Sequence, residues 1–119
     1  MTDVVRMKKR KMFVQVTEAE QKIITNFLIV QYRLNELDCV RTGFTVTKKL
    51  GNAVARNRIR RRLKEAVRLY DNMSIMTGYD LVFIGRSATK DCSFEKLKRT
   101  VYFALERILE LARQKEKND

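Results

Sequence analysis

The pattern of apolar and polar positions divides the chain into alternating helices and strands. Helical spacing from residues 9–21 predicts a first helix, with Phe13 and Val16 on its inner face. Residues 23–34 are rich in β-branched and aromatic side chains, which predicts a strand, and residues 40–48 predict a second one. Because only a short turn separates the two strands, we expect them to form an antiparallel pair.

The second strand has two different faces. Its apolar side chains alternate with small and polar ones, and side chains on a strand point to opposite faces in turn. The small, polar face is therefore the one we expect to be open to a ligand. Its members are Arg41, Gly43, Thr45, Thr47 and Lys49.

The next segment, up to Tyr70, predicts a helix that begins at Asn52, a residue that favours the N-cap position. At about 100° per residue, one apolar stripe faces the sheet, and basic side chains dominate the remainder. Like-charged neighbours one turn apart cost roughly 0.2–0.5 kcal/mol per pair, which suggests a functional reason for the basic face. The stripe comprises Ala55, Ile59, Leu63, Ala66, Val67 and Tyr70, and the opposite face carries Arg58, Arg61, Lys64, Glu65 and Arg68.

One residue of this helix does not fit the amphipathic pattern. Arg56 falls within the apolar stripe on the first turn. One interpretation is that its side chain extends past the helix end to water. The preferred interpretation is that Arg56, together with Asn57 and Arg60, forms a phosphate site at the positive end of the helix dipole.

The last third of the chain predicts a strand and a helix. Residues 79–86 form a nearly continuous apolar run, typical of a buried strand that is parallel to a neighbour. Ser93 is placed to cap a final helix, with Glu95 in its first turn. We expect a single domain over residues 1–119, with flexible tails at 1–8 and 113–119.

The charge balance points to a polyanionic partner. The chain has 26 Lys and Arg against 14 Asp and Glu, a formal charge of +12 and a pI of about 10.1. Arginine prevails in the basic helix, and its forked donors suit phosphate and structured RNA. A basic surface that only maintains solubility remains the alternative.

The inventory of reactive side chains is small. The chain has no His and two Cys, Cys39 and Cys92, which excludes a four-ligand zinc site and a His-activated nucleophile. Its own side chains are therefore not expected to supply catalysis. No stretch resembles a signal peptide or a membrane span, so we expect a reducing, cytoplasmic setting and no membrane partner.

Aromatic side chains near the predicted sheet suggest a second surface. Phe13, Phe27, Tyr32 and Phe44 could stack unpaired bases, or they could belong to the core. Sequence alone leaves both possibilities open for each residue.

Residues 48–64 (KKLGNAVARNRIRRRLK) resemble the signature of the bacterial ribonuclease P protein subunit. The preceding VRTGFTVTKKLGN and the later GYDLVFIGR also resemble that family, so the likeness extends over nearly the whole chain, from about Arg6 to Ile108. The family pattern is an Ala, two residues, Arg-Asn, two residues, two basic residues, two residues and a further basic one. It is met here by Ala53, Arg56, Asn57, Arg60, Arg61 and Lys64.

The resemblance implies an α+β fold, a two-layer α/β sandwich with a small mixed sheet of about four strands. The implied order is αβββαβα, with a left-handed βαβ crossover, as in the second domain of a small-subunit ribosomal protein. Rules drawn from sequence alone would have assigned the opposite hand.

The resemblance also implies a function. Such a protein is a subunit of an endoribonuclease that removes the 5′ leader of precursor tRNA, and its partners are the catalytic ribonuclease P RNA and precursor tRNA. Catalysis then belongs to the RNA, with Mg²⁺ required by the holoenzyme and no cofactor held by protein side chains alone, and no further protein partner is obligatory. The implied contacts to the catalytic RNA are Arg56, Asn57, Arg58, Arg60, Arg61 and Lys64.

A cleft between the basic helix and the sheet is implied for the single-stranded leader. The chain departs from the family at Thr17 and Val30, where aromatic residues are frequent, while Tyr32 keeps an aromatic on the face of Val30. The implied leader contacts are Phe13, Phe27, Val30, Tyr32, Lys48 and Lys49.

Two other classes of protein are alternatives. A small ribosomal or other structural RNA-binding protein fits the size and charge equally well, but it would not need the motif at residues 53–64. A helix-turn-helix DNA-binding protein is disfavoured, because a strand and not a short helix precedes the basic helix.

Overall fold

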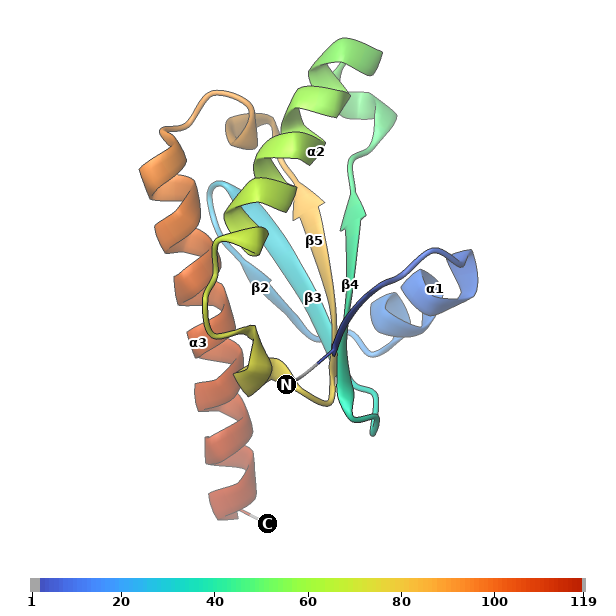
Figure 1. The fold of residues 1–119 in the computed structure, drawn as a ribbon, viewed down its shortest axis with the longest axis vertical. Coiled ribbons are helices and arrows are strands. Elements are labelled where there is room, and N and C mark those ends of the chain that lie inside the picture. Colours follow the sequence, from blue (N-terminus) through green and yellow to red (C-terminus); the bar gives the residue numbers. More distant parts are fainter. Residues whose placement is uncertain (1–2, 119) are drawn as a thin grey trace.

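The structure, a computed structural model, describes residues 3–118, which form a five-stranded sheet and three α-helices (Figure 1). Short 3₁₀ turns lie at Lys48–Leu50 (η1), Met73–Met76 (η2) and Ser87–Thr89 (η3). The other elements are β1 (Asp3–Arg6), α1 (Arg10–Glu18), β2 (Lys22–Ile24), β3 (Leu28–Leu34), β4 (Cys39–Thr45), α2 (Ala53–Arg68), β5 (Tyr79–Gly85) and α3 (Phe94–Asn118).

The strand order is β1-β4-β5-β3-β2, with β1, β4 and β5 mutually parallel and β3 antiparallel to both β5 and β2. The expected direct pairing of β3 with β4 is wrong, because β5 inserts between them. In Figure 1, α2 lies in front of the sheet and β5 lies to the left of β4, so the β4–α2–β5 crossover is left-handed. The α+β class with this crossover is confirmed, and the sheet has one strand more than expected.

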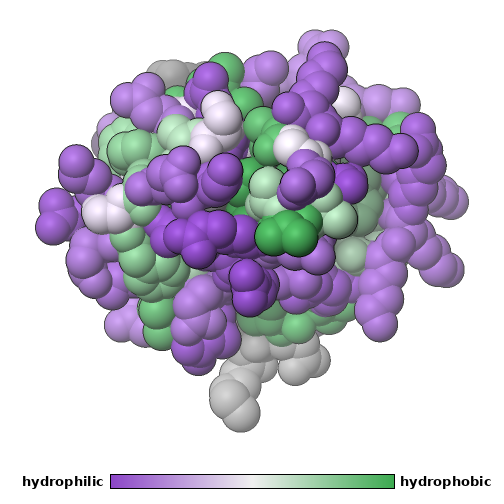
Figure 2. Space-filling model, turned by 90° about the horizontal axis from the view of Figure 1, so that it is seen from above, coloured by the Kyte–Doolittle hydropathy of each residue, from purple (hydrophilic) through white to green (hydrophobic). Residues whose placement is uncertain are grey.

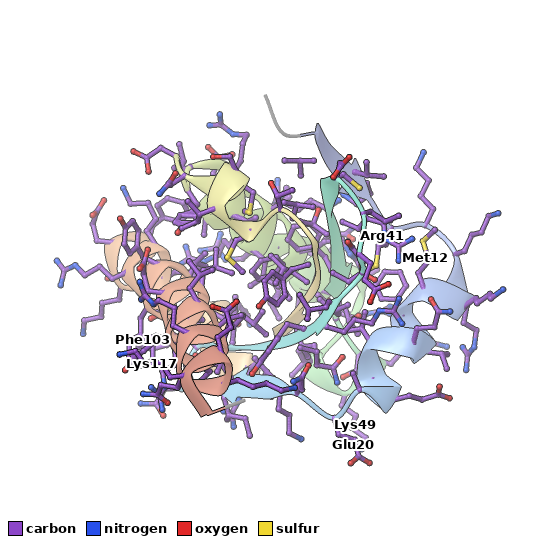
Figure 3. The ribbon with its side chains drawn as sticks, turned by 90° about the horizontal axis from the view of Figure 1, so that it is seen from below. Met12, Glu20, Arg41, Lys49, Phe103 and Lys117 are labelled. Atoms are coloured by element: carbon purple, nitrogen blue, oxygen red, sulfur yellow. The ribbon has the colours of Figure 1, made fainter. Side chains whose placement is uncertain are left out.

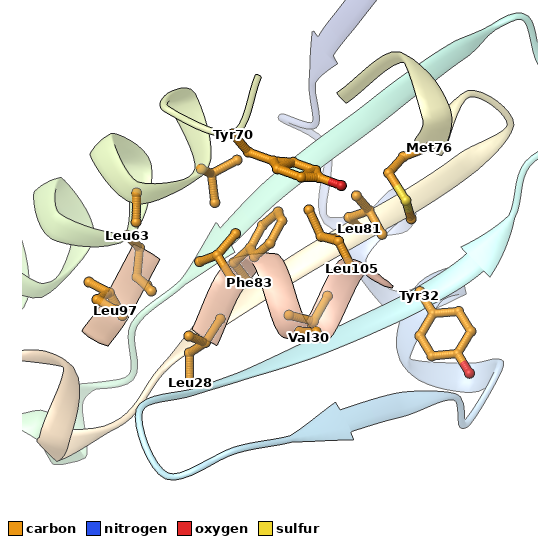
Figure 4. Packing of buried hydrophobic residues seen from close by; sticks show 14 of the residues in the cluster. Leu28, Val30, Tyr32, Leu63, Tyr70, Met76, Leu81, Phe83, Leu97 and Leu105 are labelled. Atoms are coloured by element: carbon orange, nitrogen blue, oxygen red, sulfur yellow. The ribbon is translucent and has the colours of Figure 1, made fainter. Parts of the chain in front are cut away.

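The main core lies between the sheet and the helices α2 and α3 (Figures 1 and 4). Alternate residues of β3, namely Leu28, Val30 and Tyr32, point into it, as do Leu81 and Phe83 of β5. The short α1 covers part of the opposite face. The small cluster there contains Met7, Val16 and Val82, with Met12, Phe13 and Ile84 packed against it.

The local signals for α2 and α3 are confirmed. Asn52 Oδ1 accepts the amide of Ala55 at 2.9 Å, and Ser93 Oγ accepts the amide of Lys96 at 3.1 Å. The apolar stripe of α2 is buried from Ile59 to Tyr70, while Ala55 is only half-buried. The basic residues of α2 therefore point along its sides and away from the sheet.

The predicted strand at 23–34 is in fact a hairpin. β2 and β3 are antiparallel neighbours joined through residues 25–27. The Thr25 hydroxyl donates to the carbonyl of Leu28 at 2.6 Å and accepts the amide of Leu28 at 3.1 Å. A threonine side chain thus closes a turn that contains neither Gly nor Pro, which explains why the sequence pattern missed it.

Parts of both predicted tails have regular secondary structure. In the N-terminal segment, residues 3–6 pair with β4, and the amide of Met7 donates to the carbonyl of Thr42 at 2.7 Å. At the other end, α3 continues to Asn118, because the sequence RQKEK consists of good helix formers and no residue stops the helix. Residues 1, 2 and 119 of the predicted tails lie outside the described part of the chain.

A buried carboxylate ties the central strands together on the α1 side of the sheet. Asp80 of β5 has no exposed surface, and Arg41 of β4 donates to both its oxygens at 2.7 Å. Asn35 donates at 2.9 Å, and Arg33 of β3 lies 3.3 Å away. Burial raises the pKa of Asp80, but these hydrogen bonds and positive charges outweigh it, so its pKa is lowered.

We expect Asp80→Asn to lower the free energy of unfolding at pH 7 by about 3 kcal/mol, the lower end for a broken buried ion pair. Because the pKa of Asp80 in the folded state lies below its unfolded value of about 3.9, its stabilisation is complete above about pH 4 and is lost as pH falls through the folded pKa. Urea unfolding of both proteins from pH 7 to pH 3 measures this. The difference in free energy of unfolding between the parent and Asp80→Asn should shrink at low pH. The exposed Asp71→Asn control should stay within about 0.5 kcal/mol of the parent. A difference for Asp80→Asn that does not change with pH would contradict the role of the charged carboxylate.

Candidate nucleic-acid interface

The outward side of α2 forms a basic surface. Asn57 and Arg61 are exposed, and Arg60 and Lys64 are half-buried beside them. The end of the molecule at which α2 begins is mainly hydrophilic, with a small apolar patch (Figure 2). A shallow depression of about 560 Å³ on α2 is lined by Val54, Asn57, Arg60, Arg61 and Lys64.

The arginines of α2 have different roles. Arg60 donates to Asn57 Oδ1 at 2.9 Å, which orients its guanidinium on the outer surface. Arg62, by contrast, points toward the segment before α3, where it donates to the carbonyls of Thr89 at 2.9 Å and of Cys92. Arg62 is therefore a structural clamp, whereas Arg60 remains available to a ligand.

Arg56 is half-buried, and among the described residues its Nε has no hydrogen-bond partner although that atom is buried. A buried donor without a partner costs about 1–3 kcal/mol. This geometry favours the interpretation in which Arg56 meets an anion at the start of α2 over the one in which it extends freely into water.

The positive charge continues from α2 to β1. The pKa of Lys64 is lowered, first by desolvation and then by repulsion from Arg6 and Arg60. The guanidinium of Arg6 lies over the ring of Phe44, 5.0 Å from its centroid. A bound anion would lower the repulsion among these three positive charges, so the cluster favours a phosphate ligand.

A groove of about 830 Å³ lies on the α1 side of the sheet. Its floor is formed by β3, β4 and β5 and its wall by α1, and basic side chains lie at its edges. Arg60 lines this groove as well as the depression on α2. The lining residues are Lys8, Arg10, Phe13, Val14, Thr17, Glu18, Gln31, Phe44, Thr45, Val46, Arg60, Val82 and Ile84.

The wall of the groove depends on a glycine in β4. A Cβ atom at Gly43 would lie 2.5 Å from Cε1 of Phe13 and 2.9 Å from Cε of Met7. The absence of a side chain at this position lets the Phe13 ring pack directly on the strand. The small face of β4 predicted from the sequence thus supports α1 and leaves Thr45 to line the groove. At the opposite end of this face, Arg41, which is labelled in Figure 3, pairs with Asp80.

The structure separates the predicted leader residues. Phe13 lines the groove, but Val30 is fully buried and Tyr32 is 9% exposed, both on the opposite face of the sheet. Phe27 lies in the β2–β3 turn and packs against the main core. Val30 and Tyr32 therefore do not share a cleft with Phe13, because strand alternation turns them to the other face of the sheet, and Phe27 is kept from it by its packing against the main core.

The two lysines predicted beside the leader cleft, Lys48 and Lys49, are exposed in η1, ahead of α2. They do not line the groove. The predicted contacts on α2, in contrast, lie on one continuous stretch of helix, with Arg58 turned toward the segment before α3, where its Nε donates to the carbonyl of Lys90 at 3.3 Å.

Several groove residues were not predicted from the sequence. Gln31 and Ile84 come from the α1-facing sides of β3 and β5, and Arg10 comes from α1. Thr17 of α1, where the sequence departs from the family, also lines the groove. Thr17 Oγ1 donates to Gln31 Oε1 at 3.3 Å across the groove wall. The sequence signal that could have identified Gln31 is strand alternation, which places it on the opposite face of β3 from Val30 and Tyr32.

Within residues 3–118, no group of three or more His, Cys, Asp or Glu side chains could hold a metal ion. The same part of the chain contains no helix that is both long and apolar enough to cross a membrane.

The fold and the two basic surfaces define a small α+β nucleic-acid-binding protein. A family model described as ribonuclease P matches residues 1–109. The ribonuclease P protein component of Gluconacetobacter diazotrophicus is 46% identical over 93 residues, covering 77% of this chain and 80% of that protein. The corresponding protein of Clostridioides difficile is 37% identical over 95 residues, covering 80% and 83%.

Solved structures of RNase P proteins superpose on this chain. The RNase P protein of Staphylococcus aureus superposes with a TM-score of 0.70 at 29% identity, over 92% of this chain and 96% of that one. The RNase P protein of Thermotoga maritima gives 0.71 at 25% identity, over 82% and 91%. The chain belongs to the ribonuclease P protein family, as its motif predicted. It is a subunit of the ribonucleoprotein endoribonuclease of tRNA 5′ maturation, and the ribosomal alternative is not favoured.

Because Arg62 holds the segment before α3 and Arg61 points outward, replacing each with Ala should change the stability of the protein by different amounts. Arg62→Ala should lower the free energy of unfolding by about 1–3 kcal/mol, because it leaves two carbonyls without their donor. Arg61→Ala, one position away and exposed, should change it by less than about 0.5 kcal/mol. Urea unfolding of the two variants checks this, and equal losses would contradict the clamp.

Proposed function

We propose that α2 binds the catalytic RNA of ribonuclease P and that the α1 groove holds the single-stranded 5′ leader of precursor tRNA. The observation that carries the proposal is the position of Arg60, which lines both surfaces. Because Arg60 lies at the edge shared by the two surfaces, both RNAs would contact the same rigid helix, α2.

The chemistry of α2 suits a folded RNA. Asn57, Arg60, Arg61 and Lys64 offer donors along the same outer stretch of helix. Arginine forks bind phosphate in a fixed geometry, and A-form RNA presents its backbone more readily than its base edges. We infer that α2 reads the shape of the RNA and makes salt-sensitive phosphate contacts.

The chemistry of the groove suits a single strand. Apolar side chains such as Phe13, Val14 and Ile84 offer surfaces to unpaired bases, while Lys8 and Arg10 lie at the edge where a backbone would pass. Aromatic stacking and a positively charged groove are the usual means of holding single-stranded nucleic acid. A duplex would not present its base faces to this floor.

We propose that catalysis is carried by the RNA subunit and that the protein positions the substrate. We propose that the Mg²⁺ required by the holoenzyme is not held by protein side chains alone. We further propose that the protein acts in the bacterial cytoplasm, where its free thiols, Cys39 and Cys92, would stay reduced.

A reconstitution tests the proposed function. The protein is added to a bacterial ribonuclease P RNA, and removal of the leader from precursor tRNA is followed at low magnesium. We expect faster removal with the protein than without it. Absence of stimulation with every cognate RNA tested would overturn the proposal.

Thr17→Glu tests the groove. Thr17 is exposed and lines the groove, so the substitution is tolerated by the fold and brings a negative charge toward the leader phosphates. We expect the holoenzyme to lose about 1 kcal/mol, roughly fivefold, in affinity for precursor tRNA, with little change for mature tRNA. Glu20→Gln, which changes charge outside the groove, is the control, and an equal loss for both tRNAs would contradict leader binding.

A further inference from the structure

A second groove lies on the other side of the sheet, between the β2–β3 hairpin and α3. It has a volume of about 450 Å³, within the ~300–1,000 Å³ range of ligand sites. The hairpin contributes residues 24–27, and α3 contributes Arg99, Thr100 and Phe103. The sheet separates this groove, which we call the α3 groove, from the one under α1.

The α3 groove exposes apolar surface that folding does not explain. Phe103 is 59% exposed and Ile24 is 58% exposed, although Val101, Ala104 and Leu105 of the same helix are buried. Figure 3 shows Phe103 at the outer surface of α3. Phe27 on the hairpin side is half-buried, so the groove presents one fixed and one accessible aromatic ring.

The hairpin wall is held in place from the loop after β5. Arg86 donates to the carbonyl of Thr25 at 2.6 Å, and the hydroxyl of Thr89 donates to the carbonyl of Phe27. The backbone that faces Phe103 is therefore ordered before any ligand arrives, which lowers the entropic cost of binding.

The charged residue that lines the α3 groove is a cation, Arg99. Lys96, Arg99 and Phe103 follow at helical spacing along α3, and Lys22 lies on β2. The acidic residues of α3 that border this stretch are already engaged, because Glu95 pairs with Lys98 at 3.1 Å and Glu106 accepts the hydroxyl of Tyr70 at 3.3 Å. An exposed aromatic ring one helical turn from a cation complements a nucleotide, whose base can stack on the ring while its phosphate meets the cation.

The α3 groove is also connected to the basic surface of α2. Arg58 of α2 contacts the carbonyl of Lys90, just before α3, and Arg62 holds the same segment. An RNA that lies on α2 can thus continue over Lys90 to Lys96 and Arg99. The leader groove, by comparison, opens on the opposite face of the sheet.

We propose that the α3 groove binds an unpaired nucleotide of the catalytic RNA, with the base on Phe103 and its phosphate at Arg99. The inference rests on the proposed function, since it takes the RNA on α2 to be the catalytic RNA. It adds a contact on α3 that anchors the RNA at a second point, away from the helix that carries the signature motif.

The test uses variants that separate stacking from apolar contact. Phe103→Leu keeps an apolar side chain and loses the aromatic face, whereas Phe103→Tyr keeps the face. In filter binding to the catalytic RNA, we expect Phe103→Leu to weaken affinity about tenfold and Phe103→Tyr to retain it. Arg99→Gln should reduce the slope of log affinity against log salt by about one. Tyr102→Leu, a neighbouring half-exposed aromatic outside the groove, is the matched control and should bind as the parent does.

Several outcomes would overturn the inference. Parent-like binding by Phe103→Leu, equal losses for the Leu and Tyr variants, or a loss seen only with long-leader precursor tRNA would each do so. Arg60→Ala in the same assay separates this failure from that of the proposed function. If Arg60→Ala loses affinity while Phe103→Leu does not, only the α3 groove is wrong; if the parent protein does not bind the catalytic RNA at all, the proposed function is wrong.

Discussion

The close approach of α2 to β5 is the constraint on which the rest of the structure depends. A Cβ atom at Gly85 would lie 2.6 Å from Cγ2 of Ile59 and 3.5 Å from Cδ1 of Leu63, and both side chains are fully buried. Because β5 has no side chain there, the apolar stripe of α2 packs directly on the sheet. The rotation of the helix is fixed by this contact, and so is the outward direction of its arginines. A basic surface with defined geometry follows from a packing requirement in the core.

The sheet then separates the surfaces from one another. On its α2 and α3 side it supports the main core, and on its α1 side it forms a groove floor. Arg60 at the edge is the residue through which the α2 surface and the α1 groove meet. In the proposed function, α2 is the rigid element that docks the catalytic RNA and the α1 groove holds the flexible leader, so that the protein serves the reaction by holding two RNAs in a fixed relation.

The features that were predictable from the sequence are local ones. The Asn52 cap, the buried stripe from Ile59 to Tyr70 and the start of α3 follow from cap chemistry and helical spacing, and the structure confirms them. Long-range features were not predictable. The insertion of β5 between β3 and β4 and the pairing of β1 with β4 depend on partners distant in sequence. The alternation of β3 was visible in the sequence, but not which face the core would take. The resemblance implied Val30 as a groove residue, whereas the structure buries Val30 and places Gln31 in the groove.

Photocrosslinking from two positions in one complex tests the central claim most directly. A Cys39→Ser/Cys92→Ser background carries a photoreactive group either at Thr17→Cys, in the α1 groove, or at Val54→Cys, which is 77% exposed on α2. In the holoenzyme bound to precursor tRNA, we expect crosslinks from position 17 to leader nucleotides and from position 54 to the catalytic RNA. Crosslinks from position 17 to the catalytic RNA, or the same RNA captured from both positions, would contradict the assignment of the two surfaces.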